Sequence, residues 1–213
     1  MACGLCCGMG PAAAGELAAV RSCSADFSEM RTILETRRLS LREFTGDDTD
    51  ALSRVLSDAE TMRFYPAAFD RAGVEQWFTR NLQHYAETGH GLWAMDLKAT
   101  GEMIGDCGIT LLEVDGELLP EIGYHVRRDL WGQGLATEAA RVCRDYGFSS
   151  LKAGVLISLV RPENLASRAV AERNGMAVWK ETIRNEWLHL VYRVMREHWE
   201  ASQLPSASAS RTK

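Results

Sequence analysis

The sequence lacks the features of a protein that spans a membrane or coats nucleic acid. Its longest apolar run with the character of a structural element, Val155–Val160, is interrupted by Ser158 and is far shorter than the ~20 residues that cross a bilayer. Lys and Arg number 24 against 29 Asp and Glu, a net charge of −5, so the basic surplus that binds nucleic-acid phosphates is missing. The remaining composition, 46% hydrophobic and 25% charged over 213 residues, predicts an ordinary globular protein with enough chain for a sizeable core.

Cysteine is scarce outside the N-terminal segment. Four of the six cysteines lie within residues 1–23, and only Cys107 and Cys143 fall in the body of the chain, so a secreted disulfide framework is not expected. The Cys3–Cys7 stretch lacks the second ligand pair that a closed tetrahedral zinc site requires. A signal peptide would require a basic residue before its apolar region, and no Lys or Arg precedes this stretch. We therefore expect a cytoplasmic protein that binds no metal.

Both ends of the chain have compositions that do not build a core. Residues 1–30 are rich in Ala, Gly, Cys and Ser, and residues 200–213 form a Ser/Ala tail with one proline. We expect both tails to be disordered and place a single domain at residues 31–199. Translation starting at Met30 is an alternative that the sequence leaves open.

Helical and strand patterns alternate between these tails. The stretch 134–149 repeats apolar residues at helical spacing, whereas residues 118–126 place Ile122, Tyr124 and Val126 on one face of a strand. The turn signatures Ala99–Glu102 and Asp115-Gly116 join three consecutive strands into an antiparallel meander. The pattern predicts an α+β (mixed α/β) fold, a mixed sheet with helices on its faces. The expected strands are at about 39–44, 91–98, 102–113, 118–126, 155–160, 176–183 and 187–196, and the expected helices carry Leu52–Leu56 or cover about 71–88, 134–149 and 164–174.

The stretch Trp131–Glu138 leads from the end of a strand through a glycine-containing loop into a helix. The start of a helix leaves backbone N–H groups unpaired and carries the positive end of the helix dipole, and glycines let this backbone approach an anion. A phosphate or pyrophosphate site is therefore physically natural here, and a plain strand-to-helix turn is the alternative. A P-loop is excluded because G-x-x-x-x-G-K-[ST] is absent, and a dinucleotide fold because residues 151–160 contain no acid.

The sequence W-G-Q-G-L-A at Trp131–Ala136 resembles the Q/R-x-x-G-x-G/A acetyl-CoA motif of the GNAT N-acetyltransferase superfamily, with Trp131 where Gln or Arg is usual. Its W-G-x-G-x-A-T-E-A form is similar to the RimJ/RimL branch, which acetylates protein N-termini. Leu34–Arg42 and Asn164–Met176 match the same branch and follow in the right order. The resemblance spans about residues 31–199.

This resemblance implies a GNAT fold, a mostly antiparallel mixed sheet in which the strands at 118–126 and 155–160 splay apart. It also implies acetyl-CoA as co-substrate, with pantetheine lying in the splay like an added strand. For Arg127 and Arg128 ordinary surface charge is the alternative role, and for Asn164 a helix N-cap. The residues that the resemblance assigns to acetyl-CoA are the loop amides of Gly132, Gln133, Gly134, Leu135, Ala136 and Thr137, the flanking Arg127 and Arg128, Tyr124 and Val126 along the splay, and Asn164 on the CoA arm.

Acetyl transfer requires a base, because the attacking amine must be neutral, and benefits from a donor near the departing thiolate. Family members often place a catalytic Glu on the fourth strand, which corresponds to Glu121; Glu186 and His189 near the last hairpin are the alternatives. The Tyr that many members use as donor is replaced here by Ala171. Ser167 is the donor that the RimL-like branch implies. Each of these residues has an ordinary structural role as its alternative.

We therefore expect an acetyl-CoA-dependent N-acetyltransferase that acts by direct attack in a ternary complex. The acceptor is a primary amine, on a protein N-terminus or a small molecule. The missing Tyr keeps open a non-catalytic acyl-CoA-binding sensor or partner-binding module of the same fold. We expect no nucleic-acid, membrane or metal partner and leave a homodimer open, and the acidic balance of the chain favours a cationic acceptor.

Overall fold

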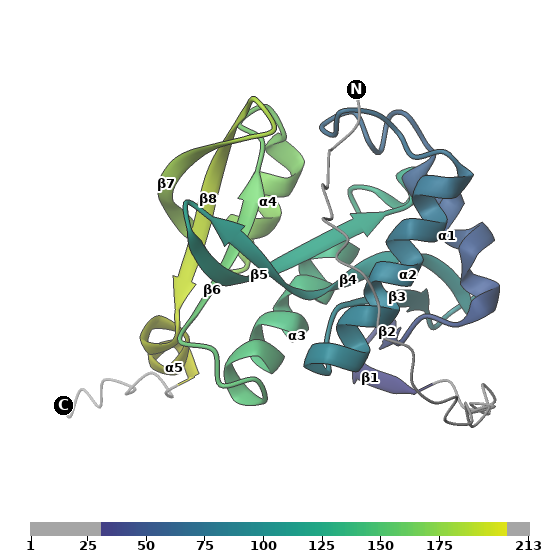
Figure 1. Cartoon of the computed structure of the whole chain (residues 1–213). Coiled ribbons are helices and arrows are strands. Elements are labelled where there is room, and N and C mark those ends of the chain that lie inside the picture. Colours follow the sequence, from purple (N-terminus) through teal and green to yellow (C-terminus); the bar gives the residue numbers. More distant parts are fainter. Residues whose placement is uncertain (1–30, 204–213) are drawn as a thin grey trace, which may run out of the picture.

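The computed structural model describes residues 31–203, so the expectations for residues 1–30 and 204–213 fall outside the described chain. Within it, eight strands form one sheet in the order β1-β2-β3-β4-β5-β6-β8-β7, with helices on both faces (Figure 1). The predicted mixed sheet is confirmed. The strands are β1 Thr32–Glu35, β2 Leu39–Arg42, β3 Leu92–Leu97, β4 Glu102–Val114, β5 Glu117–Val126, β6 Val155–Val160, β7 Ala177–Arg184 and β8 Trp187–Met195, and the α-helices are α1 Thr49–Leu56, α2 Arg71–Thr88, α3 Leu135–Ser149, α4 Leu165–Arg173 and α5 Arg196–Gln203.

Neighbouring strands pair antiparallel throughout the sheet except at its centre, where β5 and β6 run parallel. The β4–β5 hairpin keeps a continuous register from Val114↔Glu117 to Gly105↔Val126. By contrast, β5 and β6 share a single ladder position, Glu121↔Ile157, and diverge beyond it. This is the splay that the sequence predicted, and it positions the candidate site.

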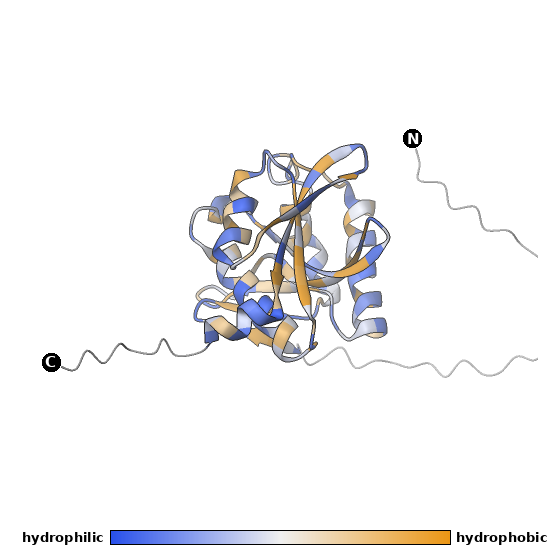
Figure 2. Cartoon of the chain, turned by 90° about the vertical axis from the view of Figure 1, so that its left-hand side faces the viewer, coloured by the Kyte–Doolittle hydropathy of each residue, from blue (hydrophilic) through white to orange (hydrophobic). Residues whose placement is uncertain are grey.

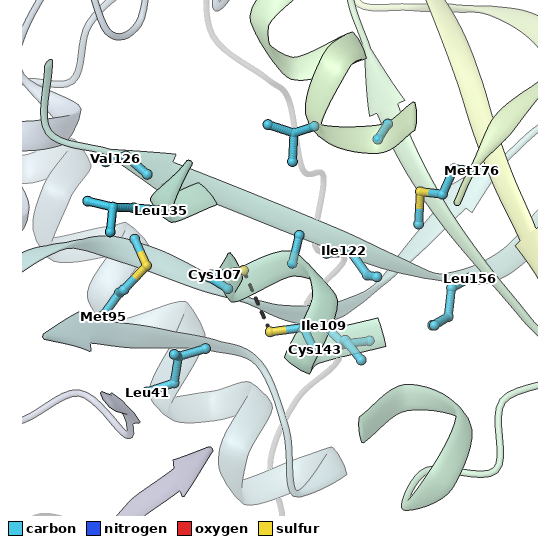
Figure 3. Packing of buried hydrophobic residues seen from close by; sticks show 14 of the residues in the cluster. Leu41, Met95, Cys107, Ile109, Ile122, Val126, Leu135, Cys143, Leu156 and Met176 are labelled. Carbon is cyan, nitrogen blue, oxygen red and sulfur yellow. Dashed lines mark hydrogen bonds between the residues drawn. The ribbon is translucent and has the colours of Figure 1, made fainter. Parts of the chain in front are cut away.

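The two larger hydrophobic cores pack on opposite faces of the sheet, and a smaller one joins β4 and β5 to β6 and β8. Because successive side chains of a strand point to opposite faces, Trp93 and Met95 of β3 pack in the core beneath α3, whereas Ala94 packs beneath α1 and α2. Figure 3 shows the first core, in which the Sγ atoms of Cys107 and Cys143 lie 3.6 Å apart. The strands at the centre of the fold are the hydrophobic part, and the outward helix faces are polar (Figure 2).

A buried ion cluster fixes β2 to the sheet. The guanidinium of Arg42 donates from Nη1 and Nη2 to Asp48 at 2.7 and 2.8 Å, and from Nε to Asp96 at 2.7 Å. Arg42 is only 7% exposed, so both carboxylates are needed to compensate the buried cation. The arginine that ends the motif Leu34–Arg42 therefore has a structural role.

The domain extends further at its C-terminal end than the sequence predicted. The last strand ends at Met195, and α5 continues through Gln203, where we expected a tail from residue 200. Trp199 of α5 packs against Phe148 with ring centroids 5.4 Å apart and donates its Nε1 hydrogen bond to Asp145 at 2.7 Å. Because α5 is held by these contacts with the distant α3, the composition of residues 200–213 alone did not predict the helix.

Candidate functional site

A cavity of about 1370 Å³ opens where β5 and β6 diverge. Its walls come from β4, β5 and β6, from α2, α3 and α4, from the β1–β2 turn, the segment 61–66 and the loop before α3, and from the β7–β8 hairpin. The volume exceeds the roughly 300–1,000 Å³ of a typical small-ligand site. The cavity therefore has room for a ligand larger than a typical small molecule.

Where β5 and β6 separate, two side chains form the hydrogen bonds between the strands in place of backbone groups. The Ser158 hydroxyl donates to the carbonyl of Ile122 at 2.9 Å, and the Glu121 carboxylate accepts the N–H of Leu159 at 3.0 Å. These bonds hold β5 and β6 at a fixed opening. Further along, backbone of both strands faces the cavity, where an extended ligand could pair with it.

Glu121 has an environment that changes its acidity. Its partly buried carboxylate lines the cavity, and desolvation raises its pKa from the usual 4.5 to about 7, although the Leu159 hydrogen bond and the charges of Arg184 and His125 act in the opposite direction. A carboxyl group of this pKa exchanges a proton readily near neutral pH. The Glu121 carboxylate thus lines the cavity with a pKa near neutrality.

The loop before α3 has the backbone of an anion site. Gly132 and Gly134 both have φ of +76°, a left-handed conformation that other residues rarely adopt. The N–H of Glu138 is the first to reach a helical carbonyl, that of Gly134 at 3.0 Å, so the amides before it remain available to a ligand. Trp131, at the unusual motif position, donates from Nε1 to the Val126 carbonyl at 2.7 Å and so anchors the loop to β5.

The motif Leu34–Arg42 contacts the glycine loop and the first turn of α3. Glu138 accepts hydrogen bonds from the Thr36 hydroxyl at 2.6 Å, from the Arg38 backbone at 2.9 Å and from Arg38 Nε at 2.7 Å. Arg38 Nη1 in turn donates to the carbonyl of Gln133 at 2.9 Å. Arg38 thereby lines the cavity beside the glycine loop, a position that the sequence analysis did not assign to it.

Three side chains of the cavity wall, those of Tyr65, Trp77 and His125, are joined by hydrogen bonds through the buried Asp106 behind them, an arrangement that was not predicted from the sequence. The Tyr65 hydroxyl is 2.7 Å from His125 Nε2, and His125 Nδ1 is 2.7 Å from Asp106 Oδ1. Trp77 Nε1 donates to the other Asp106 oxygen at 2.9 Å. Asp106 is fully buried and His125 is 8% exposed, so the chain is a rigid polar element of the wall.

Comparison with known proteins assigns the family. The sequence profile described as Acetyltransferase (GNAT) domain matches residues 38–177. The chain belongs to the GNAT acetyltransferases. It is 37% identical to YkkB, an uncharacterized protein of Bacillus subtilis, over 72% of this chain and 90% of that one.

Solved structures of GNAT proteins agree with this assignment. A crystal structure of an acetyltransferase from Agrobacterium tumefaciens covers 78% of this chain and 95% of its own with a TM-score of 0.68 and 32% identity. Mycobacterium smegmatis RimJ, solved with CoA-disulfide, covers 75% of this chain and 83% of its own with a TM-score of 0.61 and 26% identity. The predicted RimJ/RimL-like GNAT fold and the predicted acetyl-CoA-dependent acyltransferase are confirmed.

Most of the residues expected to bind acetyl-CoA, and both residues expected to be catalytic, lie in the cavity wall. Asn164 caps α4 by accepting the Ser167 N–H at 3.1 Å, and the Tyr124 hydroxyl reaches across to the Ser167 carbonyl at 2.9 Å. The residues of the expected set that line the cavity are Glu121, Tyr124, Val126, Gly132, Gly134, Leu135, Ala136, Thr137, Asn164 and Ser167.

Three of the expected acetyl-CoA residues do not line it. Arg127 is bound to Asp129 at 2.7 Å, Arg128 lies 3.8 Å from Asp58, and the Gln133 side chain is outside the cavity wall. Both arginines thus face surface carboxylates, and their contact with acetyl-CoA stays a prediction.

Among the remaining candidates of the GNAT chain, His189 lines the cavity, whereas Glu186 is an exposed turn residue with φ of +65° outside the wall. Ala171 is 1% exposed and packs in the core. Position 171 therefore points away from the cavity in this chain, and the missing Tyr says little about its chemistry.

The site fits acetyl-CoA as a substrate. The unpaired amides of the loop and of the α3 N-terminus, together with Arg38, suit a pyrophosphate, and the β5–β6 opening suits an extended pantetheine arm. Within residues 31–203 no three His, Cys, Asp or Glu side chains are grouped as metal ligands, and no helix is long and apolar enough to cross a membrane.

Proposed function

We propose that this GNAT enzyme acetylates a primary amine, either a protein N-terminus or a small molecule, by direct attack on acetyl-CoA in a ternary complex. The observation that carries the proposal is the Glu121 carboxylate, which lies where β5 and β6 separate and has a pKa of about 7. At neutral pH about half of such carboxyl groups are ionised, and the carboxylate form can accept a proton from the attacking amine.

The chemistry divides between two ends of the cavity. The neutral amine forms a C–N bond with the thioester carbonyl carbon, the C–S bond breaks, and CoA leaves as a thiolate that takes up a proton. The nitrogen loses its proton to Glu121, directly or through a water. Ser167 stands ready as the hydrogen-bond donor to the thiolate, because within residues 31–203 its hydroxyl makes no hydrogen bond.

Turnover tests this assignment. CoA release from acetyl-CoA is measured with a panel of peptide N-termini and small amines for wild type, Glu121→Gln, Ser167→Ala and the control Glu117→Gln, an exposed acid on the same strand. We expect kcat/KM to fall roughly 100-fold or more for Glu121→Gln, about tenfold for Ser167→Ala, and not at all for the control. Unchanged rates in both site variants would show that these residues do not carry the reaction.

Substrate binding is tested separately. Acetyl-CoA at about 100 times its Kd adds about 2.7 kcal/mol of stability and raises the Tm by roughly 5–10 °C for a chain of this size. Gly134→Trp should remove that shift by filling the loop. Gly101→Trp is the matched control, because Gly101 has a similar φ of +71° with open space around it and lies outside the cavity. Equal shifts in both variants would contradict the proposed binding loop.

A further inference from the structure

The charge of the cavity differs in sign from that of the chain. The whole chain has a net charge of −5, yet the cavity is lined by seven arginines and four carboxylates. Three of these arginines and three of the carboxylates lie on β1, the β1–β2 turn, α3 and α4. The remaining lining residues of the described chain carry four arginines and one acid, Glu121. The four are Arg63, which Glu60 partly offsets, Arg80, Arg161 and Arg184.

Arg161 is the most confined of the four. It follows β6 directly, and its guanidinium carbon lies 4.1 Å from the centre of the Trp187 ring on the facing hairpin. Its side chain is 18% exposed, its Nε is buried without a hydrogen-bond partner among residues 31–203, and its one ion pair is a 3.4 Å contact with Glu163, which is 63% exposed. A guanidinium has five N–H donors, so this one keeps most of its capacity for a ligand.

Arg184 adds a second positive charge to the same place. Its Nη1 donates to the backbone carbonyl of Glu113 at 3.2 Å, which leaves its charge without a carboxylate partner in the described part of the chain. Arg161 and Arg184, after desolvation, both lower the pKa of His189, and Arg184 also lowers the pKa of Glu121. The two arginines, the imidazole and the general base therefore form one cluster.

We propose that Arg161 and Arg184 form a subsite for a carboxylate carried by the acceptor, so that this enzyme acetylates amines that bear a carboxylate near the reacting nitrogen. The inference rests on the proposed N-acetyltransferase function and names its substrate class. Carboxylates match the planar fork of a guanidinium with two parallel hydrogen bonds. Arg184, whose charge acts on Glu121, and Arg161, which lines the same cavity, repel polycationic acceptors, so the local charge overrides the preference that the net charge of the chain suggested.

Matched pairs of acceptors test the subsite. They also show whether the carboxylate belongs to a free amino acid or to an acidic side chain of a peptide. One pair is alanine and alaninamide, and the other is two tetrapeptides that differ only by Glu or Gln at the second position. We expect the acidic member of at least one pair to be preferred roughly tenfold or more in kcat/KM. Preference in the first pair identifies the carboxylate of a free amino acid, and preference confined to the second identifies an acidic peptide side chain.

Variants assign the preference to the residues. Arg161→Gln should remove it mainly through KM while leaving turnover of the neutral member within about threefold, and Arg161→Lys should restore part of it. Arg193→Gln is the control, because Arg193 also stacks on a tryptophan of the hairpin, 4.4 Å from the Trp179 ring, but lies outside the cavity. A wild-type preference for the neutral members or for spermidine, or a preference that survives Arg161→Gln, would overturn the proposal.

A binding measurement separates this inference from the proposed function. Calorimetric titration of the CoA-bound protein with N-acetylalanine and N-acetylalaninamide requires no turnover. Tighter binding of the carboxylate that is lost in Arg161→Gln supports the subsite even if no amine in the panel is acetylated, an outcome that would count against the proposed function alone. Equal binding of the two compounds would overturn the subsite whatever the activity.

Discussion

The Asp106 carboxylate and the His125 imidazole lie directly opposite each other on β4 and β5, with Oδ1 and Nδ1 2.7 Å apart. A carboxylate only accepts hydrogen bonds, so His125 Nδ1 is the donor to Asp106, and the Nε2 of a neutral imidazole is then free to accept from the Tyr65 hydroxyl, whose proton is retained because desolvation and the charges of Glu121 and Asp106 raise the pKa of Tyr65. With a neutral imidazole, the proton then resides on Nδ1 and is shared with Asp106. The contact thereby fixes the tautomer of His125.

We expect Asp106→Asn to reverse this tautomer. Trp77 needs an acceptor, so the asparagine oxygen faces Trp77 and its NH₂ group faces His125 Nδ1, which must then become the acceptor. The nitrogen chemical shifts of His125 measured by NMR should report an Nδ1–H imidazole in wild type and an Nε2–H imidazole in the variant. Identical shifts in the two proteins would contradict the hydrogen-bond assignment.

The buried ion cluster should dominate the stability of the N-terminal half. Arg42→Gln leaves Asp48 and Asp96 without their cation and should lower the free energy of unfolding by about 3–5 kcal/mol. The control is Arg31→Gln, which breaks an exposed 3.5 Å pair with Glu43 and should cost less than about 1 kcal/mol. Denaturant unfolding measures both changes, and equal losses would show that the cluster has no special weight.

Glu121 should destabilise the fold above neutral pH. Its pKa is about 7 when folded and near 4.5 when unfolded, so between these values the folded state holds a proton that the unfolded state has released. The free energy of unfolding therefore decreases as the pH rises from 4.5 to 7, by at most about 3 kcal/mol from this group.

The variant Glu121→Gln isolates that contribution, because it keeps an acceptor for the Leu159 N–H and carries no charge. We expect it to be about 1–3 kcal/mol more stable than wild type near pH 8 and close to wild type near pH 4.5. Denaturant unfolding at the two pH values gives the difference. A variant that is less stable than wild type near pH 8 would contradict the prediction that burial of the ionised Glu121 carboxylate destabilises the folded state.

Arg38 should contribute to acetyl-CoA affinity. It lines the cavity beside the glycine loop, and Glu138 holds its backbone and Nε in place. We expect Arg38→Ala to weaken acetyl-CoA binding about tenfold, the loss of one charge-assisted contact. The neighbouring Arg37 is exposed and outside the cavity, so Arg37→Ala should leave the Kd unchanged in the same titration.

Much of the fold could be predicted because its signals are local. The helix expected at residues 71–88 matches α2, which an Asp70 cap begins and Gly89 in a left-handed conformation ends. The elements that were missed depend on distant partners. The short strand β1 requires β2, and α5 is held by the contacts of Trp199 with α3.

The site divides in the same way. The loop after Trp131 is a contiguous motif and Glu121 lies on a strand with a regular pattern, so their positions in the cavity wall could be predicted, whereas the chain from Tyr65 through His125 to Asp106 joins three separate segments. A signal for part of it was present. The Asp115-Gly116 turn sets the register of the hairpin, and following that register places Asp106 opposite His125. Tyr65 comes from a loop whose path no periodicity reveals.

The pH dependence of kcat/KM in wild type and Glu121→Gln, measured by CoA release with an acceptor found in the amine panel, tests the central claim most directly. We expect the wild-type value to rise through an inflection near pH 7, the pKa of Glu121, and the variant to lose this inflection together with roughly 100-fold or more of the rate. The inflection due to the amine itself should remain in both. A variant that keeps the wild-type rate and the inflection near pH 7 would contradict the assignment of Glu121 as the base.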